Sequence, residues 1–166
     1  MSVPGLGEAW LAAWSGRDPQ AFVPLCSVDV HYQDPLLEGP VRGARALGEH
    51  ATRLWAGVPD ARLEPAGPTP ARNRALALPW RLRGTHAGRL GDVPPTGHRL
   101  LLHGVFYCEL DGGPATSDDD RRMLTVRAFF DLYEAGAQLG MLPARGTLGE
   151  RALLMLAGFG LRAPRA

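Results

Sequence analysis

Two long apolar segments in the second half of the chain constrain the fold most strongly. The segments 100–110, "LLLHGVFYCEL", and 121–131, "RRMLTVRAFFD", have the length and the content of β-branched and aromatic residues that are typical of strands. The polar stretch "DGGPATSDDD" between them has the composition of a hairpin connection. We therefore predict that these two strands pair as a long antiparallel hairpin.

Two further segments show the alternation of a half-buried strand. In "NRALALPWRLRGTHAG" the apolar side chains and one histidine fall on even positions: Leu76, Leu78, Trp80, Leu82 and His86. His86 is thus expected on the inner face unless a bulge intervenes. In "VDVHYQDP" one face carries Val28, Val30, Tyr32 and Asp34, and Pro35 ends the strand. Asp34 therefore shares an apolar face.

Helices are predicted at both ends of the chain and between the strands. Residues 6–15 place Trp10, Leu11 and Trp14 at helical spacing, and a second short helix follows in "SGRDPQAFVPLC". Residues 44–56 form an amphipathic pattern that Gly57 can end. A last helix is predicted at about residues 146–160. We expect one domain over residues 1–166, with its core at about 6–143.

This order of elements favours an α+β fold, in which a conical, curved antiparallel sheet packs against N-terminal helices and a C-terminal helix follows. A cone of this kind encloses a pocket. The positions predicted to face inward combine aromatic and polar residues: Trp80, Phe106, Phe129, Tyr32, Asp34, His86 and Asp131. An apolar cavity with a few convergent polar groups is the usual form of a small-molecule site.

The composition excludes several classes of chemistry. All 18 basic residues are arginine, so Schiff-base formation, pyridoxal phosphate attachment and a phosphate-loop lysine are not available. The motifs GxSxG, HExxH and GxGxxG do not occur, and no trio of histidines and carboxylates has the spacing of a metal site. We therefore expect any chemistry to come from carboxylates, histidines, tyrosines and arginines, without a metal ion.

Charge, cysteines and hydropathy limit the partners and the compartment. A net charge of +1 gives no electrostatic reason to expect nucleic acid or a membrane surface as a partner, and a hydrophobic small molecule is the better expectation. Cys26 and Cys108 lack CxxC spacing and are expected to be buried, free thiols. Because neither a signal peptide nor a long apolar span is recognisable, we expect a cytoplasmic protein.

Three short motifs resemble a known family. "GTHAG" at 84–88, "PPTG" at 94–97 and the arrangement of Asp131, "LYEAGAQ" and "LGMLP" are similar to the SnoaL-like polyketide cyclase and ester cyclase family, within the nuclear-transport-factor-two-like superfamily. The similarity runs from about residue 10 to residue 143. It implies a conical fold and a cofactor-free pocket, in which an acidic residue near the end of the last long strand is the general base. Asp131 is the matching position.

Each candidate catalytic residue has a structural interpretation as well. Asp131 begins "DLYE", which has the form of a capping box, so it is either a helix cap or a base. Arg127 shares its parity, and an ion pair between them would lower the pKa of Asp131. His86 is either a satisfied core histidine or a donor to an enolate oxygen. Asp34, next to Pro35, is either a turn former or a second carboxylate of the pocket.

One strand leaves the choice of binding residues open. His103 and Tyr107 share one face of segment 100–110, and Leu102, Phe106 and Cys108 share the other, so only one set can line the cavity. The candidate substrate-binding residues are Tyr32, Trp80, Phe106, Phe129, His103 and Tyr107.

Three functions follow as hypotheses. The first is proton transfer on a polycyclic or aromatic carbonyl compound, as in an intramolecular aldol cyclisation or an isomerisation. The second is epoxide or ester hydrolysis, which requires Asp34, Asp131 and Arg127 to meet around one water. The third is a non-catalytic binding protein, which a cavity blocked by Trp80 or Phe106, together with Asp131 bonded to the Glu134 amide, would favour. A homodimer or higher homo-oligomer, formed through an exposed sheet face, is expected in each case.

Overall fold

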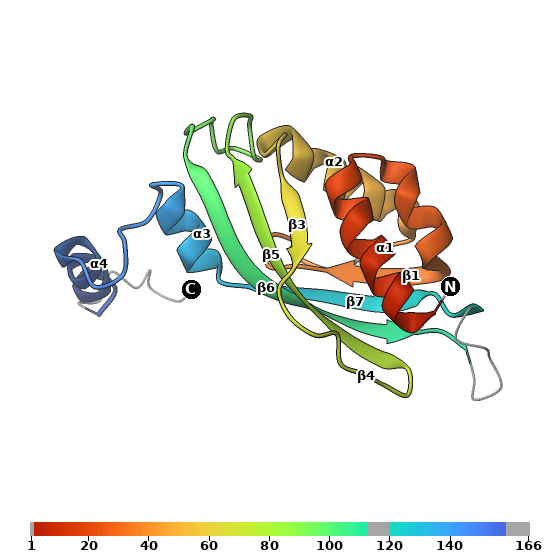
Figure 1. The fold of residues 1–166 in the computed structure, drawn as a ribbon. Helices are drawn as coiled ribbons and strands as arrows, with labels where there is room; N and C mark the ends of the chain where they lie inside the picture. Colours follow the sequence, from red (N-terminus) through yellow and green to blue (C-terminus); the bar gives the residue numbers. More distant parts are fainter. Residues whose placement is uncertain (1, 113–119, 159–166) are drawn as a thin grey trace, which may run out of the picture.

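A curved sheet with helices on one face forms the body of the protein (Figure 1). The computed structural model describes residues 2–112 and 120–158. The helices are α1 (Val3–Gly16), the 3-10 helix η1 (Pro19–Leu25), α2 (Ala44–Gly57), α3 (Leu132–Gln138) and α4 (Leu148–Gly158). The strands are β1 (Cys26–Gln33), β2 (Val41–Arg42), β3 (Arg62–Pro65), β4 (Ala71–Arg72), β5 (Ala75–Thr85), β6 (Arg99–Leu110) and β7 (Met123–Phe130).

The predicted hairpin is present and lies in the middle of the sheet. Strands β6 and β7 pair antiparallel, with Phe106 opposite Ala128 and Tyr107 opposite Arg127. Residues 113–119 of the predicted polar connection lie outside the described part of the chain. Strand β5 pairs antiparallel with the other edge of β6 along its whole length. The sheet order is β2-β1-β7-β6-β5-β3, and β4 pairs with β5.

One pairing departs from the predicted antiparallel hairpins. Strand β1 runs parallel to β7, with Tyr32 opposite Val126. A parallel neighbour requires a long crossover, and the chain between the two strands supplies most of the domain. The register of this pair also shifts between Cys26 and His31. Because such a shift turns a side chain to the other face, Val28 is 93% exposed, although its parity with Val30 predicted burial.

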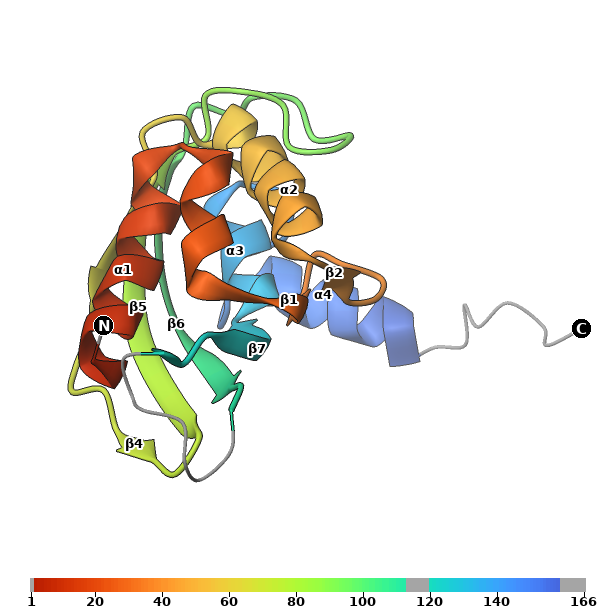
Figure 2. The same ribbon diagram turned by 90° about the vertical axis from the view of Figure 1, so that its right-hand side faces the viewer.

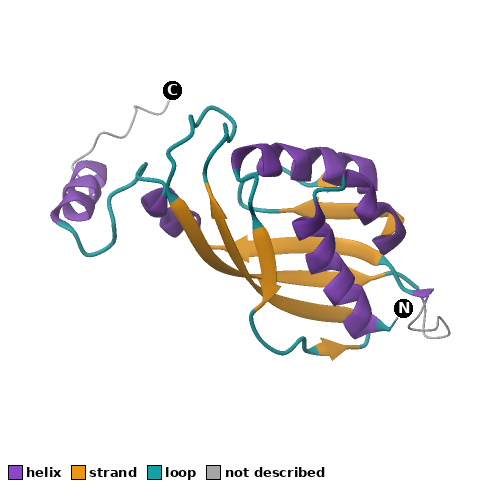
Figure 3. Cartoon of the chain, turned by 45° about the horizontal axis from the view of Figure 1, so that its top comes forward, coloured by secondary structure: helices purple, strands orange, loops and turns teal. Residues whose placement is uncertain are grey.

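Helices α1 and α2 cover the concave face of the sheet (Figures 2 and 3). Trp10 and Trp14 of α1 pack against Phe22 of η1 and against Phe106 of β6. The inward positions of β5 follow the predicted parity, since Leu76, Leu78 and Trp80 are all buried. Cys26 and Cys108 are buried free thiols, as predicted. Burial raises the pKa of Cys26 to about 12.

Helix α3 closes one end of the cone and is tied to β6 by a side chain. The Gln138 amide accepts from the Leu101 N–H at 2.8 Å and donates to the Leu101 carbonyl at 3.0 Å. It thereby pairs with the backbone of β6 as a neighbouring strand would. Helix α4 follows beyond α3. Within residues 2–112 and 120–158, none of the helices combines the length and apolar character required to cross a bilayer.

Candidate active site

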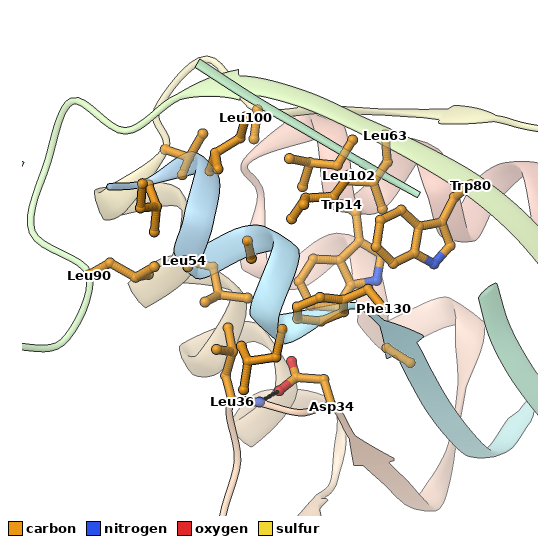
Figure 4. A pocket seen from close by; sticks show the side chains of 18 of the residues that line it. Trp14, Asp34, Leu36, Leu54, Leu63, Trp80, Leu90, Leu100, Leu102 and Phe130 are labelled. Atoms are coloured by element: carbon orange, nitrogen blue, oxygen red, sulfur yellow. Dashed lines mark hydrogen bonds between the residues drawn. The ribbon is translucent and has the colours of Figure 1, made fainter. Parts of the chain in front are cut away.

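A cavity of about 470 Å³ lies between the concave face of the sheet and helices α2 and α3 (Figure 4). Its wall is almost entirely apolar. The sheet contributes Trp80, Leu82, Leu102, Phe106, Ala128 and Phe130, the helices contribute Trp14, Leu54, Trp55 and Ala135, and Leu139 follows directly after α3. Leu90 and Val93, from the loop that contains the PPTG motif, complete one side. A volume of this size fits a small multi-ring molecule.

Asp34 is the carboxylate of the cavity wall. It follows the last residue of β1, is 5% exposed, and lies beside Leu36 and near Phe130 (Figure 4). Three donors converge on it: Tyr32 Oη at 3.1 Å and His50 Nε2 at 2.7 Å reach Oδ2, and the Leu36 N–H reaches Oδ1 at 2.9 Å. These bonds replace the water that burial removes. Both interpretations of Asp34 therefore hold, because it forms the turn and also lines the cavity.

Tyr32 stands beside Asp34 and keeps its proton. Burial first, and the neighbouring Asp34 charge second, raise the pKa of the Tyr32 phenol well above its usual range. At neutral pH its hydroxyl is therefore a hydrogen-bond donor, and its acceptor is Asp34. Tyr32, Trp80 and Phe106 all line the cavity, as predicted for substrate-binding residues.

His50 was missed by the sequence analysis. It lies on α2, is buried, and makes the shortest of the three bonds to Asp34. The signal was present in the helical spacing, since His50 follows Leu47 by three residues and precedes Leu54 by four, on the face that packs against the core. A buried histidine on the apolar stripe of a helix requires a polar partner, and the inward Asp34 was available for that role.

Asp131 lies outside the cavity, so its predicted position is wrong. Its side chain is 50% exposed; Oδ1 accepts the Glu134 N–H at 3.0 Å, and Oδ2 accepts from Arg145 Nη2 at 2.7 Å. The backbone bond to Glu134 first, and the Arg145 charge as a smaller cause, lower the pKa of Asp131. An exposed carboxylate with a lowered pKa is a poorer base than the predicted one. The capping interpretation is the one that the structure confirms.

His86 is buried but stands apart from the cavity wall. It lies one residue beyond β5 and is 0% exposed, which agrees with its inward parity. The Thr96 N–H donates to its Nδ1 at 3.2 Å, so the ring hydrogen is on Nε2. Within the described residues, Nε2 has no hydrogen-bond partner. His86 thus holds the PPTG loop, and the described cavity lining gives it no contact with a substrate.

The remaining predicted binding residues lie on the convex face of the sheet. Phe129 is 52% exposed, and His103 and Tyr107 are exposed as well, because the parity set of Phe106 faces inward. They therefore do not line the described cavity, in contrast to the prediction. Arg127 shares this outer face, and the partner of Asp131 is Arg145 rather than Arg127.

This geometry also bears on two other kinds of chemistry, hydrolysis and metal binding. The hydrolytic arrangement of Asp34, Asp131 and Arg127 around one water is not formed, since Asp34 is enclosed and the other two are exposed. In the described ranges, the histidines, cysteines and carboxylates form no group of three that could hold a metal ion. Of the two features expected for a non-catalytic protein, the bond from the Glu134 N–H to Asp131 is present, whereas Trp80 and Phe106 border the cavity without filling it.

Solved structures with this architecture come from several bacteria. AclR of Streptomyces galilaeus, a proposed hydroxylase, superimposes with a TM-score of 0.70 at 22% identity, over 93% of this chain and 91% of AclR. IdmH of Streptomyces antibioticus, a proposed polyketide cyclase, gives 0.66 at 19% identity, over 82% and 97%. A protein of Catenulispora acidiphila with a ketosteroid isomerase-like fold gives 0.68 at 16% identity, over 85% and 95%. These similarities establish the fold.

The sequence comparison agrees with the resemblance in the motifs. No curated protein matches the chain by sequence. The family model of the SnoaL-like domain matches residues 8–117, which span α1 to the end of β6 and include Asp34, Tyr32 and His50. The chain therefore belongs to the SnoaL-like domain family and has its conical α+β fold.

Proposed function

We propose that the protein is an acid/base enzyme that transfers a proton on a hydrophobic, polyketide-like carbonyl compound, without a cofactor. The reaction class is an intramolecular aldol cyclisation or an isomerisation. One observation carries the proposal: a single carboxylate, Asp34, borders an otherwise apolar cavity and is backed by two buried polar side chains. The proposed cyclases among proteins of the same fold are consistent with this class.

Asp34 is the general base in this proposal. A substrate whose rings occupy the apolar cavity brings the carbon next to its carbonyl to the Asp34 carboxylate, because the rest of the described lining offers no other anion. The carboxylate removes the proton and becomes a neutral acid. A base that is only 5% exposed needs little reorganisation of solvent during this step.

Tyr32 and His50 act through Asp34. When Asp34 takes the proton, it becomes a weaker acceptor, and the Tyr32 hydroxyl is free to donate to the developing enolate oxygen. His50 is a positioning residue, since its Nε2 fixes the carboxylate at 2.7 Å and it does not contact the cavity in the described lining.

The experiment measures proton abstraction directly. A neutral naphthyl methyl ketone is incubated with the protein in D2O, and the loss of the protons next to its carbonyl is followed by NMR. We expect Asp34→Asn to lower the protein-catalysed exchange rate by about 100-fold or more, as for the loss of a general base. Asp131→Asn is the matched control and should keep the wild-type rate, because Asp131 is outside the cavity.

Binding separates this proposal from the non-catalytic alternative. Trp14, Trp55 and Trp80 border the cavity, so quenching of tryptophan fluorescence reports occupancy by the ketone. Binding without exchange in the wild-type protein would support a carrier. Exchange that survives in Asp34→Asn, with binding intact, would show that another group is the base.

A further inference from the structure

The wall of the cavity is closed at one end and open at the other. Four lining residues at the closed end pack together as a small apolar cluster in which none is more than 7% exposed: Val58, Ala61, Leu100 and Leu139. Leu36 and Leu132 also line the cavity, yet they are 44% and 46% exposed. An apolar side chain that reaches both a cavity and the solvent borders an opening. We refer to the opening that Leu36 and Leu132 border as the mouth.

Asp34 lies at the mouth rather than at the closed end. The Leu36 N–H donates to Asp34 Oδ1 at 2.9 Å, and Figure 4 shows these two residues at the opposite end of the site from Leu100. Strand β1 runs parallel to β7, so the residues that follow β1 continue beside the end of β7, where Leu132 begins α3. The only carboxylate of the described lining therefore stands just inside the mouth.

This position fixes the direction in which a substrate must lie. In the proposed reaction the carbon next to the carbonyl is at Asp34, and the aromatic rings gain most by burial at the closed, apolar end of the cavity. The carbonyl end of the molecule is then the end that faces the mouth. A substituent on the far side of the carbonyl has a way out, whereas a substituent on the distal ring meets the closed wall.

We propose that the mouth is a second binding subsite, which holds an alkyl chain attached to the carbonyl side of the substrate. The inference rests on the proposed function, because it places the reacting carbonyl at Asp34. Leu36 and Leu132 offer hydrocarbon surface that is continuous with the cavity wall, and a chain that covers them removes this surface from water. The substrate class is therefore an aryl ketone whose carbonyl carries a hydrocarbon chain.

Two isomeric ketones test the direction of binding. Heptyl naphthyl ketone carries its chain on the carbonyl side, and naphthyl methyl ketone with a hexyl group on the distal ring carries it on the ring side. The two have the same atoms, so general hydrophobicity does not separate them. We expect heptyl naphthyl ketone to bind at least about 10-fold more tightly, measured by quenching of the cavity tryptophans. Equal affinities, or tighter binding of the ring-side isomer, would overturn the proposal.

Variants show whether the chain leaves through the mouth. Leu36→Asn combined with Leu132→Asn should abolish the preference for heptyl naphthyl ketone, because both side chains that cover the chain become polar. Leu154→Asn combined with Leu156→Asn is the matched control, since these leucines are exposed on α4 and lie outside the cavity lining. Met141 is the third exposed lining residue and follows α3. A preference that survives in the mouth variant, or that is lost in Met141→Gln instead, would show that the chain takes another route.

The affinities of the isomers and the proton exchange are separate measurements, so the two proposals fail separately. Equal affinities of the isomers, together with an exchange that Asp34→Asn abolishes, would refute the mouth subsite alone. A clear preference for heptyl naphthyl ketone, together with an exchange that survives in Asp34→Asn, would refute the assigned base alone.

Discussion

Asp34 and Asp131 each follow the last residue of a strand and each accept a local backbone N–H, yet their surroundings differ. Asp34 ends β1 on the concave side, where Tyr32 and His50 replace solvent around it. Asp131 ends β7 on the open side, where water and Arg145 surround it. Local turn chemistry is therefore the same for both residues, and only the tertiary environment separates the proposed base in the cavity from a helix cap.

The exposed position of Asp131 leads to a prediction about pH. Its folded-state pKa is lowered from 3.8, so its ionised form contributes stability that is fully present above 3.8 and is lost as the pH falls through the folded value. Asp131→Asn should therefore be less stable than the wild type at neutral pH, and the difference should shrink below about pH 4. Urea unfolding of both proteins across this pH range measures the difference in their free energies of unfolding. A difference that grows towards acid pH would contradict the assigned cap and ion pair.

The two aspartates also show how far the sequence could place the site. In β1 the parity of Val30, Tyr32 and Asp34 gave the correct inward face, because the alternate positions are polar. In β7 both parity sets contain large apolar residues, so Phe129 and Phe130 were equally acceptable inside. The inward face of β7 is set by β6, where Phe106 and Cys108 point to the core, and that choice requires the folded partner.

At the scale of elements, the periodicity of the sequence predicted the strands and helices. It predicted the pairing of the strands only in part. The β6–β7 hairpin was predictable because two long apolar segments follow each other in the chain with only a polar connection between them. The parallel contact of β1 with β7 joins segments about ninety residues apart, and it also creates the bulge that exposes Val28. The Asp34–His50 pair joins residues only 16 apart in the chain, but it requires α2 to lie across the end of β1, and strand parity alone does not predict that position.

Close packing at Gly104 gives a prediction at this scale. A Cβ at this position of β6 would lie 2.3 Å from Trp80 Cζ2 and 2.4 Å from the Phe129 carbonyl, so Gly104→Ala must displace either the cavity wall or the β6–β7 pairing. We expect a loss of about 1–3 kcal/mol in the free energy of unfolding. Gly16→Ala is the control, since a Cβ there meets nothing within 4 Å, and it should be neutral or slightly stabilising. If the two substitutions change the free energy of unfolding equally in chemical denaturation, the cavity wall at Trp80 is easily displaced.

At the scale of the whole molecule, the cone encloses a cavity, and the lack of basic side chains in its described lining determines which ligands it favours. The described lining provides one acidic side chain, Asp34, and no basic one. An anionic ligand would lose its hydration without gaining a counter-charge, and it would also approach the Asp34 carboxylate. A neutral aromatic ketone has neither cost, and its carbonyl end can lie next to Asp34 and Tyr32.

This selectivity predicts that charge, rather than size, decides what the protein binds. A naphthyl methyl ketone should bind at least about 100-fold more tightly than naphthoate at neutral pH, because an unpaired charge costs several kcal/mol on transfer to an apolar site. Quenching of the cavity tryptophans measures both dissociation constants. Asp34→Asn should narrow the gap by removing the repulsion of the anion, and Asp131→Asn should leave it unchanged, since that residue lies outside the cavity. Equal affinity for the two probes would mean that ligands bind elsewhere, and the proposed enclosure of the substrate against Asp34 would be wrong.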